Sequence, residues 1–141
     1  MIVVDTNVIS EVTRAAGSRI IETWLDGHLA ETLFVASTSV AEMLAGLASM
    51  PTGRRRADLE LRLEQLLARL FADRVLPFDE AAARRYGSIA GRARAIGVAI
   101  SMPDCQIAAI AESNGMIVAT RDVNPFRGVG LRVVNPWESG A

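Results

Sequence analysis

Four acidic residues occupy positions from which one folded domain could bring them together. They are Asp5, Glu42, Asp104 and Asp122. Clusters of carboxylate oxygens without sulfur suit hard divalent cations such as Mg²⁺ or Mn²⁺. Two such cations about 4 Å apart can activate a water molecule and stabilise the leaving oxygen of a phosphodiester. The four residues therefore favour metal-dependent hydrolysis of a nucleic acid backbone.

The expected secondary structure carries these carboxylates to one edge of a sheet. Asp5 and Asp122 each follow a short apolar run that is typical of a buried strand. Glu42 lies about one turn into the helix expected after the second strand. Asp104 lies in the first turn of a helix that starts at Pro103. Ligands of open α/β sheets bind at the carboxyl ends of the strands, so all four acids can meet there.

Each acid also has a simpler explanation when it is taken alone. Asp5 and Asp104 both suit helix N-caps, where a carboxylate interacts favourably with the helix dipole. Glu42 stands in a largely apolar stretch, although a solvent-facing position fits the pattern too, and Asp122 fits an ordinary turn. The combination carries more weight, because four carboxylates at one edge repel one another unless cations neutralise them.

Short apolar runs alternate with amphipathic segments, which predicts an α/β fold with a small, mainly parallel sheet. Strands are expected at residues 2–4, 32–36, 75–78, 116–119 and 131–134, the third at an edge because it contains Pro77. One helix is expected to follow residues 5–7, a second to begin at Ser18 as its N-cap, and a third to follow residues 37–39. Three more are expected at residues 54–71, 80–96 and 103–113. The Ser18 helix is expected to have Ile20, Ile21, Trp24 and Leu25 on one face, and the helix that residues 37–39 open is expected to carry Val40, Met43, Leu44 and Leu47.

The composition narrows the domain organisation and the chemistry. A chain of 141 residues, half of them hydrophobic, predicts a single domain over residues 1–141. All 15 basic residues are arginines, so mechanisms that need a lysine are excluded. Phosphotransfer through Asp5 as a covalent nucleophile, as in receiver or haloacid-dehalogenase-like domains, normally needs such a lysine. It also needs a second Asp at the position that Asn7 occupies.

The remaining reactive residues give little support to other classes. The one cysteine, Cys105, cannot form an internal disulfide, and the one histidine, His28, lies in a polar turn far from the acids, which disfavours a zinc site. The first residues have neither a basic start nor a long apolar run, and no stretch is apolar enough to span a membrane. A cytoplasmic protein without a membrane partner is expected.

At this point the motifs resemble those of a known family. MIVVDTNVIS at Asp5, SVAEML at Glu42, MPDCQIAAIA at Asp104 and VATRDVNPF at Asp122 are similar to the motifs of PIN-domain nucleases. Within that family they resemble the VapC and FitB-like toxins of type II toxin–antitoxin pairs, and the closing VVNPW does so too. The resemblance runs from residue 1 to about 138 at matching spacing.

The resemblance implies a three-layer fold and a Mg²⁺- or Mn²⁺-dependent endoribonuclease that uses a metal-activated water. It also implies a homodimer, and an antitoxin partner that blocks the site and links the toxin to DNA. The alternative is a catalytically weak domain that serves mainly to bind the antitoxin in a promoter-bound complex.

The resemblance also assigns residues to the site. The metal-binding acids are Asp5, Glu42, Asp104 and Asp122, with the fourth position open between Asp122 and Asn124. Thr6, Asn7, Thr120 and Asn124 fall where supporting polar groups orient the carboxylates. Arg121 is a candidate for holding a substrate phosphate, or else for pairing with an acid. Trp24 and Trp137 are expected to pack, because a base-stacking platform normally needs clustered aromatic residues.

Overall fold

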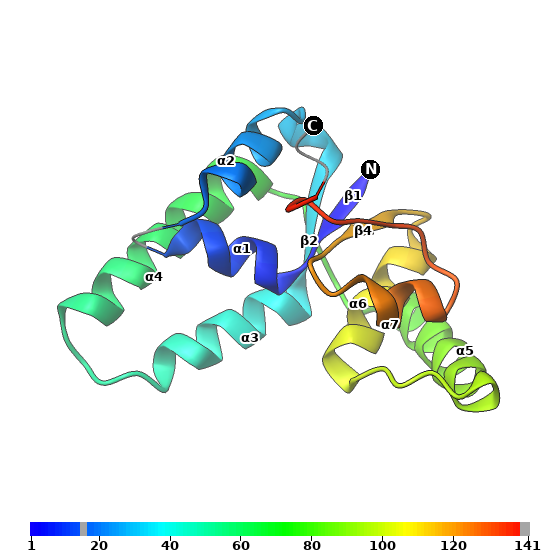
Figure 1. The fold of residues 1–141 in the computed structure, drawn as a ribbon. Helices are drawn as coiled ribbons and strands as arrows, with labels where there is room; N and C mark the ends of the chain where they lie inside the picture. The colour runs from blue at the N-terminus through cyan, green and yellow to red at the C-terminus, as the bar shows by residue number, and fades with distance from the viewer. Residues whose placement is uncertain (15–16, 139–141) are drawn as a thin grey trace.

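The computed structural model describes residues 1–14 and 17–138. A five-stranded parallel sheet, in the order β3-β2-β1-β4-β5, runs through the centre of the molecule (Figure 1). Its strands are β1 (Ile2–Val4), β2 (Leu33–Ala36), β3 (Val75–Leu76), β4 (Ile117–Ala119) and β5 (Val133–Val134). All five predicted strands are confirmed, and β3 lies at an edge as Pro77 indicated. The predicted single domain includes residues 15–16 and 139–141, which lie outside the described residues.

Helices cover both faces of the sheet. They are α1 (Thr6–Thr13), α2 (Arg19–Asp26), α3 (Ser37–Ala48), α4 (Arg54–Leu66), α5 (Glu80–Ile96), α6 (Met102–Ser113) and α7 (Val123–Gly128). Figure 1 shows α1, α2 and α4 on one side of the strands and α5, α6 and α7 on the other, while α3 packs against α1, α4 and α6. The expected three-layer α/β fold is confirmed. No helix in the described part of the chain is both long enough and apolar enough to cross a membrane.

The helix predicted for residues 54–71 changes character near its end. After α4, the backbone widens into a π-helical turn at Leu67–Phe71. This widening lets Leu66 and Phe71, five residues apart, both enter the core. The chain then leaves the helix at Ala72, whose φ is +41°.

Two further expectations need correction. The helix α7 was not predicted, because Pro125 and Gly128 within six residues give no helical pattern; the burial of Phe126 holds it in place. Ile20 was expected on the apolar face of its helix but is 51% exposed, and the apolar Leu44 of α3 is 42% exposed. The buried faces of their helices turn other side chains toward the core, such as Ile21 in α2.

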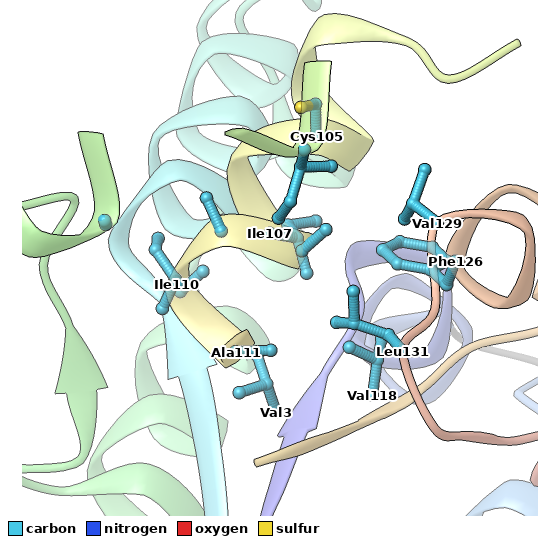
Figure 2. Packing of buried hydrophobic residues seen from close by; sticks show 14 of the residues in the cluster. Val3, Cys105, Ile107, Ile110, Ala111, Val118, Phe126, Val129 and Leu131 are labelled. Carbon is cyan, nitrogen blue, oxygen red and sulfur yellow. The ribbon is translucent and has the colours of Figure 1, made fainter. Parts of the chain in front are cut away.

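The sheet separates two apolar clusters. The first joins α5, α6 and α7 to the strands, with Val3 and Val118 beneath Ile107 and Ile110 of α6 (Figure 2). The second packs α1, α2 and α4 against the opposite face. Both faces of β1 and β4 are therefore buried, which explains their continuous apolar sequences.

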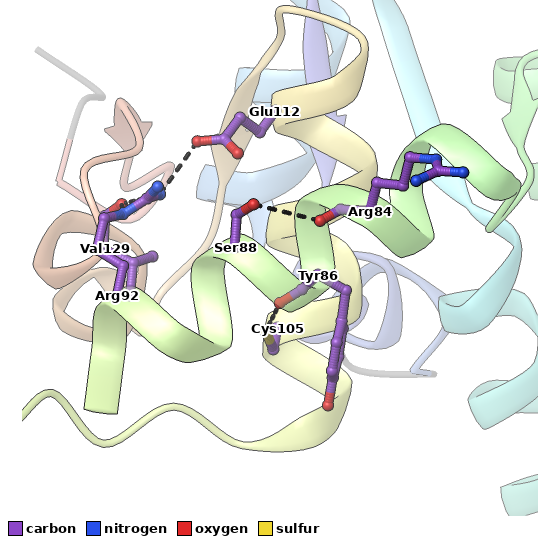
Figure 3. Close-up of polar contacts among 7 residues, drawn as sticks. All are labelled: Arg84, Tyr86, Ser88, Arg92, Cys105, Glu112 and Val129. Carbon is purple, nitrogen blue, oxygen red and sulfur yellow. Dashed lines mark hydrogen bonds and ion pairs between the residues drawn. The ribbon is translucent and has the colours of Figure 1, made fainter. Parts of the chain in front are cut away.

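An arginine on α5 fixes the segment after α7 to the rest of this layer. The Arg92 guanidinium lies 3.1 Å from a carboxylate oxygen of Glu112 on α6, and it donates two hydrogen bonds, of 2.6 and 3.1 Å, to the carbonyl of Val129 (Figure 3). The chain that leads from α7 to β5 is thereby anchored to α5 and α6.

Two glycines of the α5 region test the helix boundary. Gly97 ends α5 with φ of +74°, whereas Gly91 lies inside the helix with open space around it. Gly91→Ala is expected to raise the free energy of unfolding by about 0.5–1 kcal/mol. Gly97→Ala is expected to lower it by about 1 kcal/mol, because alanine is strained in the left-handed region. Urea denaturation of both variants measures the difference, and effects of the same sign would contradict this boundary.

Candidate active site

The centre of the candidate site forms where two neighbouring parallel strands end. Val4 of β1 pairs with Ala119 of β4, so the next residues, Asp5 and Thr120, emerge side by side. The backbone N–H of Asp5 donates to the carbonyl of Ala119 at 2.9 Å, which continues the pairing by one step. The sheet itself therefore sets the position of the Asp5 carboxylate.

Hydrogen bonds hold the Asp5 side chain, which is only 4% exposed. One carboxylate oxygen accepts from the backbone N–H of Thr6 at 2.7 Å, and the other accepts from the Thr120 hydroxyl at 2.8 Å. The Thr120 hydroxyl accepts in turn from the Asn7 amide at 3.3 Å and from the backbone N–H of Asp122 at 3.1 Å. The polar residues expected beside Asp5 thus form one network that fixes its orientation.

Two helices bring the second and third acids to the same edge. The helix α3 follows β2 directly, and it presents Glu42 as an exposed side chain in its second turn. The N-cap Ser101 of α6 accepts a hydrogen bond from the backbone N–H of Asp104 at 3.2 Å. Asp104 is half-buried in the first turn of that helix. Both helices start at the rim, as the sequence predicted.

Electrostatics link the acids to one another. Burial raises the pKa of Asp5 to about 6, and repulsion from Asp104 and Glu42 adds to the shift, against the lowering effect of its hydrogen bonds. Burial also raises the pKa of Asp104, with a further contribution from the charge of Asp122. Each of the four acids therefore feels at least one of the others.

A cleft of about 420 Å³ contains three of these acids. Its lining comprises Asp5, Thr6, Asn7, Ser10, Glu11, Arg14, Glu42, Asp104, Arg121 and Trp137. Ser10, Glu11, Arg14 and Trp137 were not predicted as site residues. Ser10, Glu11 and Arg14 lie three, four and seven residues after Asn7. This helical spacing could have indicated that they share a face with Asn7. Trp137 follows β5, and parallel strands all end at this edge.

The fourth position is less enclosed. Asp122 is the N-cap residue of α7, is exposed, and does not line the cleft, although its charge reaches Asp104. Asn124 is exposed in the first turn of α7 and is likewise absent from the cleft lining. Asp122 acts on Asp104 through its charge, and the choice between Asp122 and Asn124 as the fourth member stays a prediction.

Other features of the fold are separate from this chemistry. A larger cleft, of about 840 Å³, lies between α1, α2 and α4 and contains none of the four acids. His28 packs against Trp24 and hydrogen-bonds to its carbonyl, far from a metal-binding role. Cys105 is buried, and burial raises the pKa of its thiol, so it acts as a packing residue.

The donor set of the acidic cluster fits a hard cation, but its side chains do not yet converge. Within residues 1–14 and 17–138, no ion pair includes any of the four acids. In the same residues, no three acidic, histidine or cysteine side chains already form a group that could hold a metal ion. Sharing one cation with Asp5 would therefore require a change in the side-chain conformations of Glu42 and Asp104.

The raised pKa of Asp5 predicts a pH dependence of stability in metal-free protein. Between about pH 4 and pH 6 the folded chain holds a proton on Asp5 that the unfolded chain has lost, so the free energy of unfolding falls as pH rises. Asp5→Asn removes this pH dependence. From pH 4 to pH 6, the free energy of unfolding of the variant is therefore expected to rise relative to that of the wild type by on the order of 2 kcal/mol. Urea denaturation in EDTA at a series of pH values measures it. A difference that stays constant from pH 4 to pH 7 would refute the shift.

Comparison with known proteins supports the fold and the motifs. The PIN domain model matches residues 2–130. A VapC ribonuclease, Y4jK, from Sinorhizobium fredii is 46% identical over 138 residues, which cover 98% of this chain and 99% of that protein. Toxin FitB from Neisseria gonorrhoeae is 40% identical over 137 residues, covering 97% and 99%. The solved structure of FitAB bound to an IR36 DNA fragment has a TM-score of 0.90 at 40% identity, covering 98% of this chain and 96% of that one.

The two relatives are similar over nearly the whole chain, and the family model spans the positions of all four motifs. The resemblance that those motifs predicted is confirmed: the chain belongs to the PIN-domain family.

Proposed function

We propose that this protein is a metal-dependent endoribonuclease and the toxin of a type II toxin–antitoxin pair. The observation that carries the proposal is the buried Asp5 carboxylate, held by Thr6 and Thr120 among acids that repel it. Such an arrangement is costly unless a cation binds there. The 46% identity to a protein named as a VapC ribonuclease supports RNA as the substrate.

The four acids differ in how firmly the fold holds them, and in the proposed metal site one would be a fixed ligand and the others movable ligands. Asp5 is the fixed ligand, because two hydrogen bonds restrain its carboxylate and leave further lone pairs for a metal ion. Glu42 and Asp104 are more exposed and complete the site by rotation, with Asp122 supporting Asp104. A bound Mg²⁺ or Mn²⁺ supplies an activated water and stabilises the leaving oxygen of the phosphodiester.

The remaining cleft residues suit a polyanionic substrate. Arg121 and Arg14 lie at the cleft, and neither is buried, so both are accessible to phosphate. Asn7 connects the segments after β1 and β4, since its side-chain amide oxygen accepts a hydrogen bond from the backbone N–H of Arg121 at 3.4 Å. The cleft is open to solvent, so its acids and arginines are accessible from outside the protein.

The partners follow from the same relatives. A protein named toxin FitB and a FitAB complex on DNA are similar to this chain along nearly its whole length. We therefore propose a cognate antitoxin that covers the acidic cleft and links the toxin to DNA. We also propose a homodimer that acts in the cytoplasm, where its RNA substrate is found.

One observation favours a second candidate function, that of a catalytically weak domain that mainly binds the antitoxin. The acids of the described residues do not already form a metal-binding group. If they cannot rotate into place, the cleft serves only as a docking surface. Activity measurements distinguish the two functions.

RNA cleavage is the direct test of the nuclease. The purified, antitoxin-free protein is expected to cut cellular RNA with Mg²⁺ or Mn²⁺ and not in EDTA. Asp5→Asn and Asp104→Asn are each expected to slow cleavage by about 100-fold or more, because each removes a metal-binding charge. Gel analysis of the RNA fragments measures the rates.

Asp73→Asn is the matched control. Asp73 is 92% exposed and precedes β3, so it lies toward the opposite edge of the sheet from the acids. Its variant is expected to cut RNA at the wild-type rate. Absence of metal-dependent cleavage of any cellular RNA by the wild type would favour the antitoxin-binding function.

Thermal unfolding tests the metal site without RNA. Mn²⁺ is expected to raise the melting temperature of the wild type more at pH 7.5 than at pH 5, because Asp5, with a pKa of about 6, must lose its proton to bind. Asp5→Asn is expected to lose this stabilisation while Asp73→Asn keeps it. A wild type whose melting temperature does not respond to Mn²⁺ would oppose the proposed site.

A further inference from the structure

The cleft contains an arginine, Arg121, whose contact is with an aromatic ring. The Arg121 guanidinium lies 4.9 Å from the centre of the Trp137 ring, a distance typical of a cation–π contact. Both side chains line the cleft that contains Asp5, Glu42 and Asp104. A cationic side chain is thus present at the acidic cluster, yet it contacts an indole.

Simple electrostatics would place this guanidinium on a carboxylate. Within residues 1–14 and 17–138, however, none of the ion pairs includes Arg121. Pairing with a cleft acid would neutralise part of the charge that attracts a metal ion. It would also occupy carboxylate oxygens that the ion needs. A contact with the indole instead leaves the carboxylates available for a metal ion and the guanidinium available for a phosphate.

The two partners are anchored separately, and the contact is therefore defined by the fold. The backbone N–H of Arg121 donates to the side chain of Asn7, beside Asp5. The backbone N–H of Trp137 donates to the side chain of Asn135 at 3.0 Å, and the ring is half-buried against the apolar cluster of the α1, α2 and α4 layer. The backbone N–H of Thr120 donates to the carbonyl of Val134 at 3.0 Å, which holds the two segments together.

We propose that Trp137 is a positioning residue that holds Arg121 at the rim of the cleft, away from the carboxylates and free to bind a phosphate of the RNA strand. This inference rests on the proposed nuclease function. It assigns Trp137, which the sequence suggested was a packing residue, a role in both metal affinity and substrate affinity.

The first arm of the experiment measures Mn²⁺ binding without RNA, by calorimetry. Trp137→Leu keeps an apolar side chain but loses the aromatic face, so Arg121 is released toward the acids. Mn²⁺ affinity is expected to fall by about two- to fivefold, the range of an exposed cation–π contact. The double variant Trp137→Leu/Arg121→Ala is expected to bind Mn²⁺ at least as tightly as the wild type, because the competing guanidinium is gone.

The second arm measures RNA binding and RNA cleavage. A mixed-sequence, single-stranded, fluorescent RNA is titrated in EDTA, where it stays intact, and steady-state cleavage is measured with saturating Mn²⁺. Trp137→Leu and Arg121→Ala are each expected to weaken RNA binding and raise KM by about two- to fivefold, with a smaller change in kcat. Trp137→Phe retains an aromatic ring, so its RNA affinity and its KM are expected to stay close to those of the wild type. Arg94→Ala, which removes an exposed arginine near the end of α5, is the charge-matched control.

The outcomes separate this inference from the proposed function. If the wild type binds Mn²⁺ and cuts RNA but Trp137→Leu leaves Mn²⁺ affinity and KM unchanged, the positioning role is wrong and the nuclease stands. A loss of Mn²⁺ affinity that Arg121→Ala does not reverse would also overturn it, since that pattern indicates a general structural defect. A wild type that neither binds Mn²⁺ nor cuts RNA overturns both. If Trp137→Leu does not fold, Trp137→Met, which also lacks an aromatic face, replaces it in both arms with the same expected losses, and unchanged Mn²⁺ affinity and KM in that variant would overturn the positioning role.

Discussion

Repulsion among carboxylates is the constraint on which the arrangement of this site depends. Asp5 is almost fully buried, and Asp104 and Glu42 both oppose its ionisation. A fold maintains such a cluster only if other interactions hold it and a cation relieves it on binding. The parallel pairing of β1 with β4 provides the first condition, because it fixes Asp5 next to the Thr120 hydroxyl.

The other parts of the molecule can be understood as supports for that edge. The two apolar clusters clamp β1 and β4 from both faces, so the strand ends are rigid. The helices α3 and α6 start at this edge and carry Glu42 and Asp104, which are less buried than Asp5. In the proposed function, Asp5 is the fixed ligand, and Glu42 and Asp104 would complete the site when a cation binds. The Arg121–Trp137 contact fits this scheme, because it would keep the Arg121 guanidinium from taking the place of that cation.

Much of this could be predicted from the sequence, and the failures have physical causes. Strands such as residues 2–4 and 116–119 are β-branched runs bounded by polar residues, and the acids after them must share an edge in a parallel sheet. The helix α7 depends on the tertiary burial of Phe126, which no local pattern reveals. Trp137 contacts Arg121 only because β5 lies beside β4, so its neighbours were invisible in the sequence. Asp5, Glu42 and Asp104, which line the cleft, were recognisable from their motifs, whereas the exposure of Asp122 was not.

Diffraction from crystals soaked in Mn²⁺, collected at the manganese absorption edge, tests the central claim most directly. The account predicts an anomalous peak within about 2.2 Å of an Asp5 oxygen, with Asp104 or Glu42 rotated onto the same ion and Arg121 still against Trp137. A cleft without a peak, in which the Arg121 guanidinium pairs with Asp5 or Asp104, would contradict it.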